Sequence, residues 1–161
     1  MKFPKRLIAF VALLAIVLGG VSLAYASNGR ENSDAGVAPE IEGTWLGLID
    51  NGSDLPFPSL ITYARGGALI VTDGGTRPAL GNLYQGTWTK TGPHEYTFTF
   101  MGFMYDETGA LAGYFKTHET VQVDPDGNVY NGVTEGQIFD VDMTLIAEFS
   151  GTTHATRIPA D

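Results

Sequence analysis

The sequence predicts an all-β domain of about eight antiparallel strands, closed into an up-and-down barrel. First, polar residues alternate with aromatic and β-branched ones, the period-2 pattern of a half-buried strand. It is clearest at residues 95–100 (EYTFTF), where Tyr96, Phe98 and Phe100 share one face. Second, short turns separate these runs, such as residues 124–128 (DPDGN), in which proline and glycine favour a reversal of the chain. Third, no segment after residue 26 has the pattern of a helix.

Eight runs along the chain are expected to be strands. Glycine-rich turns such as residues 65–67 (RGG) separate consecutive runs, as in hairpins. Isolated glycines inside the runs, including Gly86 and Gly102, are typical of bulges and bends that let a sheet curl. The predicted strands cover residues 43–50, 57–64, 68–73, 82–90, 94–105, 111–123, 128–139 and 143–157.

The short connections between the runs favour a closed barrel. An open sheet of eight strands leaves two edges whose backbone groups can pair with other chains, and closing the sheet removes both edges. A two-layer sandwich with Greek-key crossovers is the alternative. The long crossover loops that a sandwich needs are not evident in this sequence.

The first 26 residues have the three parts of a secretory signal peptide. Three basic residues within positions 2–6 precede an unbroken apolar run at residues 7–18, and Ala24 and Ala26 supply the small residues read by a signal peptidase. We therefore expect cleavage before Ser27 and export to the periplasm or the outside of the cell. An uncleaved membrane anchor is the alternative, because residues 7–26 match the length of about 20 apolar residues that spans a bilayer.

Residues 27–40 are predicted to form a flexible lead, because they contain no aromatic and almost no large apolar residue. The folded domain is expected to cover residues 41–158. The chain after residue 26 carries all 18 acidic residues but only six of the nine basic ones, so its formal net charge is −12. Such a surface repels phosphate groups, which argues against nucleic acid and anionic membranes as partners. The chain has no cysteine, which excludes disulfides and a thiol nucleophile.

The first predicted strand begins with Gly43, Thr44 and Trp45, and the last ends at Arg157. A G-x-W sequence on the first strand and an arginine on the last resemble those of the lipocalins and the wider calycin barrels. The resemblance implies that Trp45 plugs one end of the barrel and that Arg157 packs across its ring, a contact favoured by the electronegative ring face. A shortened barrel is equally similar to allene oxide cyclase-like and dirigent-like proteins. A second G-T-W occurs at residues 86–88.

No pattern in the sequence indicates a catalytic site, a metal site or a cofactor. The three histidines, His94, His118 and His154, are far apart and have no metal-ligand spacing, and a G-x-S-x-G motif is missing. Catalytic residues therefore stay unknown, and no cofactor is expected. The carboxylates that could serve acid–base chemistry if buried are expected to face water, since most charged side chains in strands do; they are Asp106, Glu119 and Glu148.

The most unusual segment is residues 98–105 (FTFMGFMY), in which apolar residues beyond Gly102 occupy both faces of the predicted strand. Methionine and aromatic side chains adapt to apolar ligands of irregular shape. The alternative is that both faces are buried, one in the core and one against a loop or another subunit. The residues predicted to bind an apolar ligand are Phe98, Phe100, Met101, Phe103, Met104, Tyr105 and Tyr114.

Three functions fit this sequence. The first is an exported barrel that binds a small apolar molecule in its interior. The second is an enzyme of the same shape, an isomerase or cyclase whose pocket folds its substrate, because orientation alone can supply much of a rate enhancement. The third is a structural or interaction domain with a filled core. The sequence leaves the ligand and the oligomeric state open, and an oligomer is possible.

Overall fold

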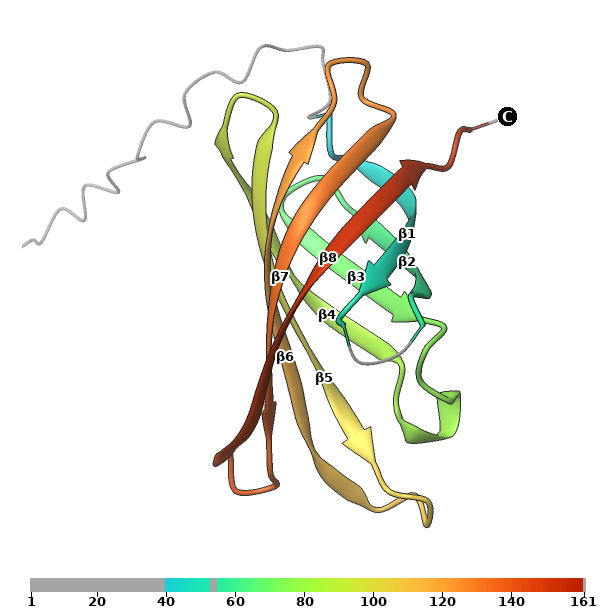
Figure 1. Ribbon diagram of the computed structural model, residues 1–161, viewed down its shortest axis with the longest axis vertical. Helices are drawn as coiled ribbons and strands as arrows, with labels where there is room; N and C mark the ends of the chain where they lie inside the picture. The colour runs from blue at the N-terminus through green and yellow to red at the C-terminus, as the bar shows by residue number, and fades with distance from the viewer. Residues whose placement is uncertain (1–39, 53–54, 161) are drawn as a thin grey trace, which may run out of the picture. The chain divides into compact units, whose positions relative to one another are not determined.

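The protein is a closed barrel of eight antiparallel strands (Figure 1). The computed structural model describes residues 40–52 and 55–160. Each strand pairs with the next along the chain, and β1 pairs with β8 to close the sheet. The all-β, up-and-down prediction is therefore confirmed. The strands are β1 (Gly43–Asp50), β2 (Phe57–Tyr63), β3 (Ala68–Asp73), β4 (Leu83–Gly92), β5 (Glu95–Tyr105), β6 (Leu111–Val123), β7 (Val129–Phe139) and β8 (Leu145–Arg157).

The predicted strands match the observed ones to within two residues at either end. One of the larger differences is at the end of β4, which was expected to stop at Lys90. A bulge between Lys90 and Gly92 keeps the strand in the ladder, so that Gly92 still pairs with Glu95 of β5. The connection from β3 to β4 also contains one unpredicted turn of 3₁₀ helix, η1 (Pro78–Leu80). Among the residues that the structure covers, no helix is long and apolar enough to cross a membrane.

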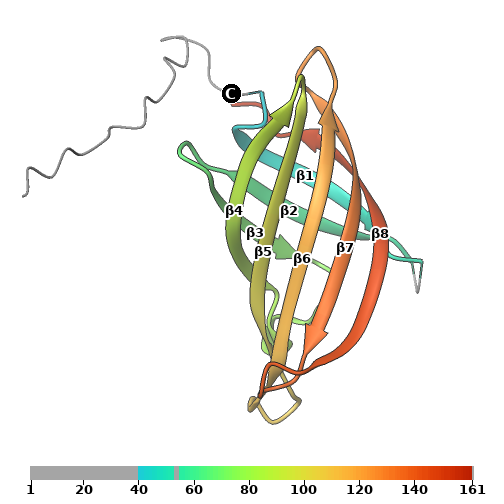
Figure 2. The same ribbon diagram turned by 90° about the vertical axis from the view of Figure 1, so that its left-hand side faces the viewer.

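The predicted signal peptide at residues 1–26, and all of the predicted lead except Glu40, lie outside the described residues. Within the barrel, β5 to β8 have 11 to 13 residues each, whereas β1, β2 and β3 have six to eight. Figure 2 shows the long strands running the length of the barrel with the short ones crossing behind them.

One end of the barrel is filled by its own side chains. This end lies where β1, β3, β5 and β7 begin, and aromatic rings pack there edge to face or tilted. The Trp45 and Tyr130 ring centroids are 4.9 Å apart, and the Tyr63 and Tyr130 hydroxyl groups are 3.2 Å apart. The buried apolar residues at this end include Ile41, Trp45, Tyr63, Leu69, Tyr96, Phe98, Val121, Val123 and Tyr130.

Arg157 holds the chain across this filled end. Its guanidinium carbon lies 4.3 Å from the centroid of the Trp45 ring. The guanidinium donates hydrogen bonds to three backbone carbonyls, at 2.6 Å to Gly127, at 2.6 Å to Glu42, and to Glu40. Trp45 in turn donates its indole N–H to the carbonyl of Ile41 at 2.9 Å. The segment before β1 is thereby fastened to the last strand and to the β6–β7 turn.

Candidate functional site

The opposite half of the barrel encloses a cavity of about 600 Å³. It lies where β1, β3, β5 and β7 end, and the residues of its rim include Asn51 and Leu55 after β1 and Gly75, Thr76, Leu80 and Gly81 after β3. Ligand pockets in proteins range from roughly 300 to 1,000 Å³. The cavity is therefore large enough for a small organic molecule.

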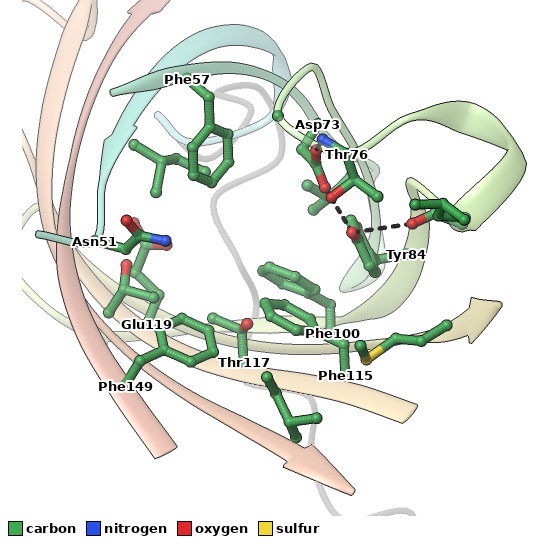
Figure 3. Close-up of a pocket in the computed structure, with 18 of the residues that line it drawn as sticks. Asn51, Phe57, Asp73, Thr76, Tyr84, Phe100, Phe115, Thr117, Glu119 and Phe149 are labelled. Carbon is green, nitrogen blue, oxygen red and sulfur yellow. Dashed lines mark hydrogen bonds between the residues drawn. The ribbon is translucent and has the colours of Figure 1, made fainter. Parts of the chain in front are cut away.

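The cavity wall is mostly apolar, and every strand contributes at least one apolar or aromatic side chain to it; several of them, including Phe57, Phe100 and Phe115, are labelled in Figure 3. Three phenylalanines, from β5, β6 and β8, form a stacked row, and Phe149 reaches Phe115 across Gly136 of β7. The Phe100 and Phe115 centroids are 6.3 Å apart, and those of Phe115 and Phe149 are 5.3 Å apart. Tyr84 packs against the same row at 5.6 Å from Phe100. The apolar and aromatic side chains that line it from β1 to β8 include, in order, Ile49, Phe57, Val71, Tyr84, Phe100, Phe115, Ile138 and Phe149.

Strand β6 brings polar groups into this apolar wall. Alternate residues of a strand share a face, so Phe115, Thr117 and Glu119 all point inward. Thr117 is 1% exposed and Glu119 is 2% exposed. Within the described part of the chain, neither Thr117 Oγ1 nor Glu119 Oε1 has a hydrogen-bond partner. Unpartnered buried polar atoms are rare in folded proteins, so these two groups are candidates for contact with a bound molecule.

Glu119 has an environment that favours its neutral form. Burial raises the pKa of its carboxyl group to about 7, and hydrogen bonds from Thr153 and Thr134 oppose part of this rise. The carboxyl group lies over the backbone of Gly132 in β7. A Cβ atom there would approach Glu119 Oε1 to 2.4 Å, so only glycine leaves this room. Glu119 can therefore hold or release a proton near neutral pH inside the barrel.

A second polar group lies on the wall opposite Glu119 (Figure 3). The Tyr84 hydroxyl donates a 2.5 Å hydrogen bond to Asp73 Oδ2, and the Thr76 backbone N–H donates one of 2.6 Å to Asp73 Oδ1. Burial, together with the bond to Asp73, raises the pKa of Tyr84 well above its ordinary value. The turn that follows β3 thus binds one carboxylate oxygen of Asp73, and Tyr84 of β4 binds the other.

The cavity carries negative but no positive groups. Its charged lining residues are Asp73 and Glu119, and no lysine, arginine or histidine is among the lining residues that the structure describes. Over residues 40–52 and 55–160, no three acidic or histidine side chains are grouped so that they could hold a metal ion. The arrangement offers hydrogen-bond acceptors and a buried acid in an apolar chamber.

The structure divides the seven residues predicted to bind an apolar ligand. Phe100, Met104 and Tyr105 line the cavity. Phe98 lies in the filled end, 5.4 Å from the Tyr63 ring. The remaining three, Met101, Phe103 and Tyr114, are not among the cavity-lining residues.

The alternation of β5 explains this division. It continues through Gly102, so Met101 and Phe103 belong to the outer face, where Phe103 is 54% exposed and packs 5.9 Å from Tyr114. A bulge between Met104 and Tyr105 interrupts the alternation, so both of these neighbours line the cavity.

The expectation that Glu119 faces water is wrong. Asp106 and Glu148 are exposed, but Glu119 is buried, because its position in β6 belongs to the inward face that also carries Val121 and Val123. The sequence contains this signal, since Phe115, Val121 and Val123 alternate in step with Glu119. Tyr84, Phe115 and Phe149 were also missed, because nothing in their local sequence distinguishes a cavity wall from a packed core.

Comparison with known protein families finds no family model that matches this chain, and comparison with curated proteins finds no match either.

Proposed function

We propose that this protein is an exported barrel that binds a small, predominantly apolar molecule in its interior. One observation carries the proposal: a cavity of about 600 Å³ to which all eight strands contribute an apolar or aromatic side chain. The signal-like segment at residues 1–26 supports a location in the periplasm or outside the cell.

The contrast between the two ends of the barrel supports binding over a purely structural role. At the Trp45 end, large aromatic side chains fill the interior. In the other half, Val71, Thr117 and Thr134 occupy inward positions and leave a chamber. Protein interiors are normally packed to the density of organic crystals, so a cavity of this size needs an explanation. A bound molecule in contact with the phenylalanine row supplies one.

Uptake of a neutral, environment-sensitive dye tests the proposal, and N-phenyl-1-naphthylamine is a suitable probe. We expect saturable fluorescence enhancement with a stoichiometry near one. Met104→Lys should weaken uptake far more than it lowers stability, because it places a charge at the edge of an apolar site. The matched control is Met101→Lys, the same substitution on the outer face of the same strand. Absence of saturable uptake in the folded wild type, or equal loss in both variants, would overturn the proposal.

Glu119 favours a second function, an isomerase or cyclase of the same shape. A carboxyl group whose pKa is about 7 is suited to move protons at neutral pH, and Glu119 lines the cavity that would hold a substrate. The test is to isolate the bound molecule and incubate it with wild type and Glu119→Gln. Conversion by the wild type alone supports the enzyme, and recovery of the unchanged molecule from both supports a carrier.

A further inference from the structure

We propose that the cavity selects molecules with a protonated amino group at one end, bound by the Glu119 carboxylate and the Thr117 hydroxyl. This inference rests on the proposed binding function and names the chemical class of the ligand. Its apolar body would lie against the phenylalanine row of the wall, and its amino group would point away from the rim.

The first argument is the geometry of β6. This strand runs from the rim toward the filled end, so Glu119 lies deeper than Thr117. The two residues are separated by two positions on one face, about 7 Å along the strand, and both line the cavity. Each has a buried polar atom without a partner among the described residues. An ammonium group has three donors and no acceptor, and therefore satisfies both oxygens together.

The second argument is charge. The cavity lining of the described chain contains Asp73 and Glu119 and no basic side chain. A carboxylate or phosphate ligand would lie beside two acidic side chains without a compensating basic side chain in the described lining. A cationic ligand would instead be attracted to these acidic side chains. The negative formal charge of the whole protein also attracts cations toward the rim.

The third argument is the state of Glu119 itself. Its carboxyl group accepts hydrogen bonds from two threonine hydroxyls, and none of the described residues that line the cavity is basic, so burial raises its pKa to about 7. An ammonium group at hydrogen-bonding distance favours the ionised form, so the carboxyl group would give up its proton as the amine binds. A neutral alcohol can also form hydrogen bonds with these oxygens, but it lacks the attraction between an ammonium group and the carboxylate.

Three probes that differ only in the polar end compare an amine, an alcohol and a carboxylate. They are 2-(2-naphthyl)ethylamine, 2-(2-naphthyl)ethanol and the anion of 2-naphthaleneacetic acid. Titration calorimetry at pH 7.5 should show the amine binding about tenfold or more tightly than the alcohol, because a charge-assisted hydrogen bond is stronger than a neutral one. The carboxylate should bind most weakly.

Two nearly isosteric variants identify the groups responsible. Glu119→Gln should reduce the affinity for the amine to that for the alcohol, and Thr117→Val should reduce it by a smaller factor. Glu135→Gln, an exposed position on β7, is the matched control and should leave all three affinities unchanged. Circular dichroism and thermal unfolding establish that each variant is folded.

Proton release gives an independent readout. At pH 6, binding of the amine to the wild type should release close to one proton per site, seen as a dependence of the binding heat on the buffer's ionisation enthalpy. Glu119→Gln should show no such release. Equal affinity for amine and alcohol, unaffected by Glu119→Gln, would overturn the amine assignment while leaving the binding function standing. Failure of all three probes and of the neutral dye would overturn both.

Discussion

Arg157 of β8 lies over the indole ring of Trp45 in β1. The two residues are also directly opposite each other in the β1–β8 pairing that closes the barrel. One contact thus joins the first strand to the last. The same guanidinium binds the carbonyls of Glu40, Glu42 and Gly127, so it also fixes the segment that enters the barrel. A planar cation that stacks on an aromatic ring and donates several hydrogen bonds at once is a role that lysine cannot fill.

Trp45→Ala should lower the free energy of unfolding by about 3–5 kcal/mol, as for other large-to-small changes in a core. The reason is that Trp45 is fully buried and supports both Tyr130 and Arg157. Urea unfolding followed by circular dichroism measures the effect. Trp88→Ala is the control, because Trp88 is only partly buried at the edge of the core and should cost less. Equal, small losses at both positions would contradict the plugging role.

The stability of the protein should depend on pH through Glu119. The pKa of this carboxyl group is about 7 in the folded protein and 4.5 as a reference value, so the folded state holds the proton more tightly. Its contribution is therefore fully present below about pH 4.5 and is lost as the pH rises to about 7. The loss amounts to about 3 kcal/mol by linkage.

The difference between wild type and Glu119→Gln isolates this effect. Relative to the wild type, the variant should gain up to about 3 kcal/mol between pH 4.5 and pH 7.5, measured by urea unfolding at several pH values. Tyr63, Tyr84 and Tyr130 also face the interior, but their pKa values are raised, so they stay protonated over this range. Asp73 is common to both proteins, and its contribution cancels. Parallel pH profiles for the two proteins would disprove the assignment.

Tyr84→Phe should destabilise the protein by about 1–3 kcal/mol, because it leaves Asp73 Oδ2 in a buried position without its donor. Thermal unfolding at neutral pH measures the loss. Tyr114→Phe removes the same hydroxyl from a ring on the outer face and should have little effect. If the two variants unfold at the same temperature, the Tyr84–Asp73 bond contributes nothing to stability.

We predict that the mature protein begins at Ser27. Residues 24–26 place alanine at the two positions that a signal peptidase reads, so intact-mass measurement should show the loss of residues 1–26. Replacement of Ala26 by a bulky residue such as tyrosine should block processing. Full-length wild-type protein recovered from the membrane fraction would instead support the anchor.

The fold could be predicted because its signals are local. Each strand is indicated by its own alternating pattern, as in residues 95–100, and by the turns at its ends. The short connections between strands then allow only a few topologies. The paired positions of Trp45 and Arg157 follow from strand order and register once the barrel closes.

The cavity could be predicted only in part, because it depends on which side chains face one another across the interior of the barrel. Local composition drew attention to residues 98–105, yet the phase of the alternation turns Met101 and Phe103 outward, and a bulge brings Tyr105 back toward the interior. Glu119 was missed for the opposite reason. Because glutamate is charged, its side chain was expected to face water. Glu119 instead points inward, because it shares the inward face of β6 with Val121 and Val123.

The filled Trp45 end has a kinetic consequence. A molecule in the chamber has to leave through the rim by which it entered, so bound and incoming molecules cannot pass each other and exchange proceeds by full dissociation. The lifetime of a complex would then depend on the turns after β1 and β3, which form part of the rim. Substitutions in these turns could therefore change the residence time of a bound molecule without altering the Trp45–Arg157 contact at the other end.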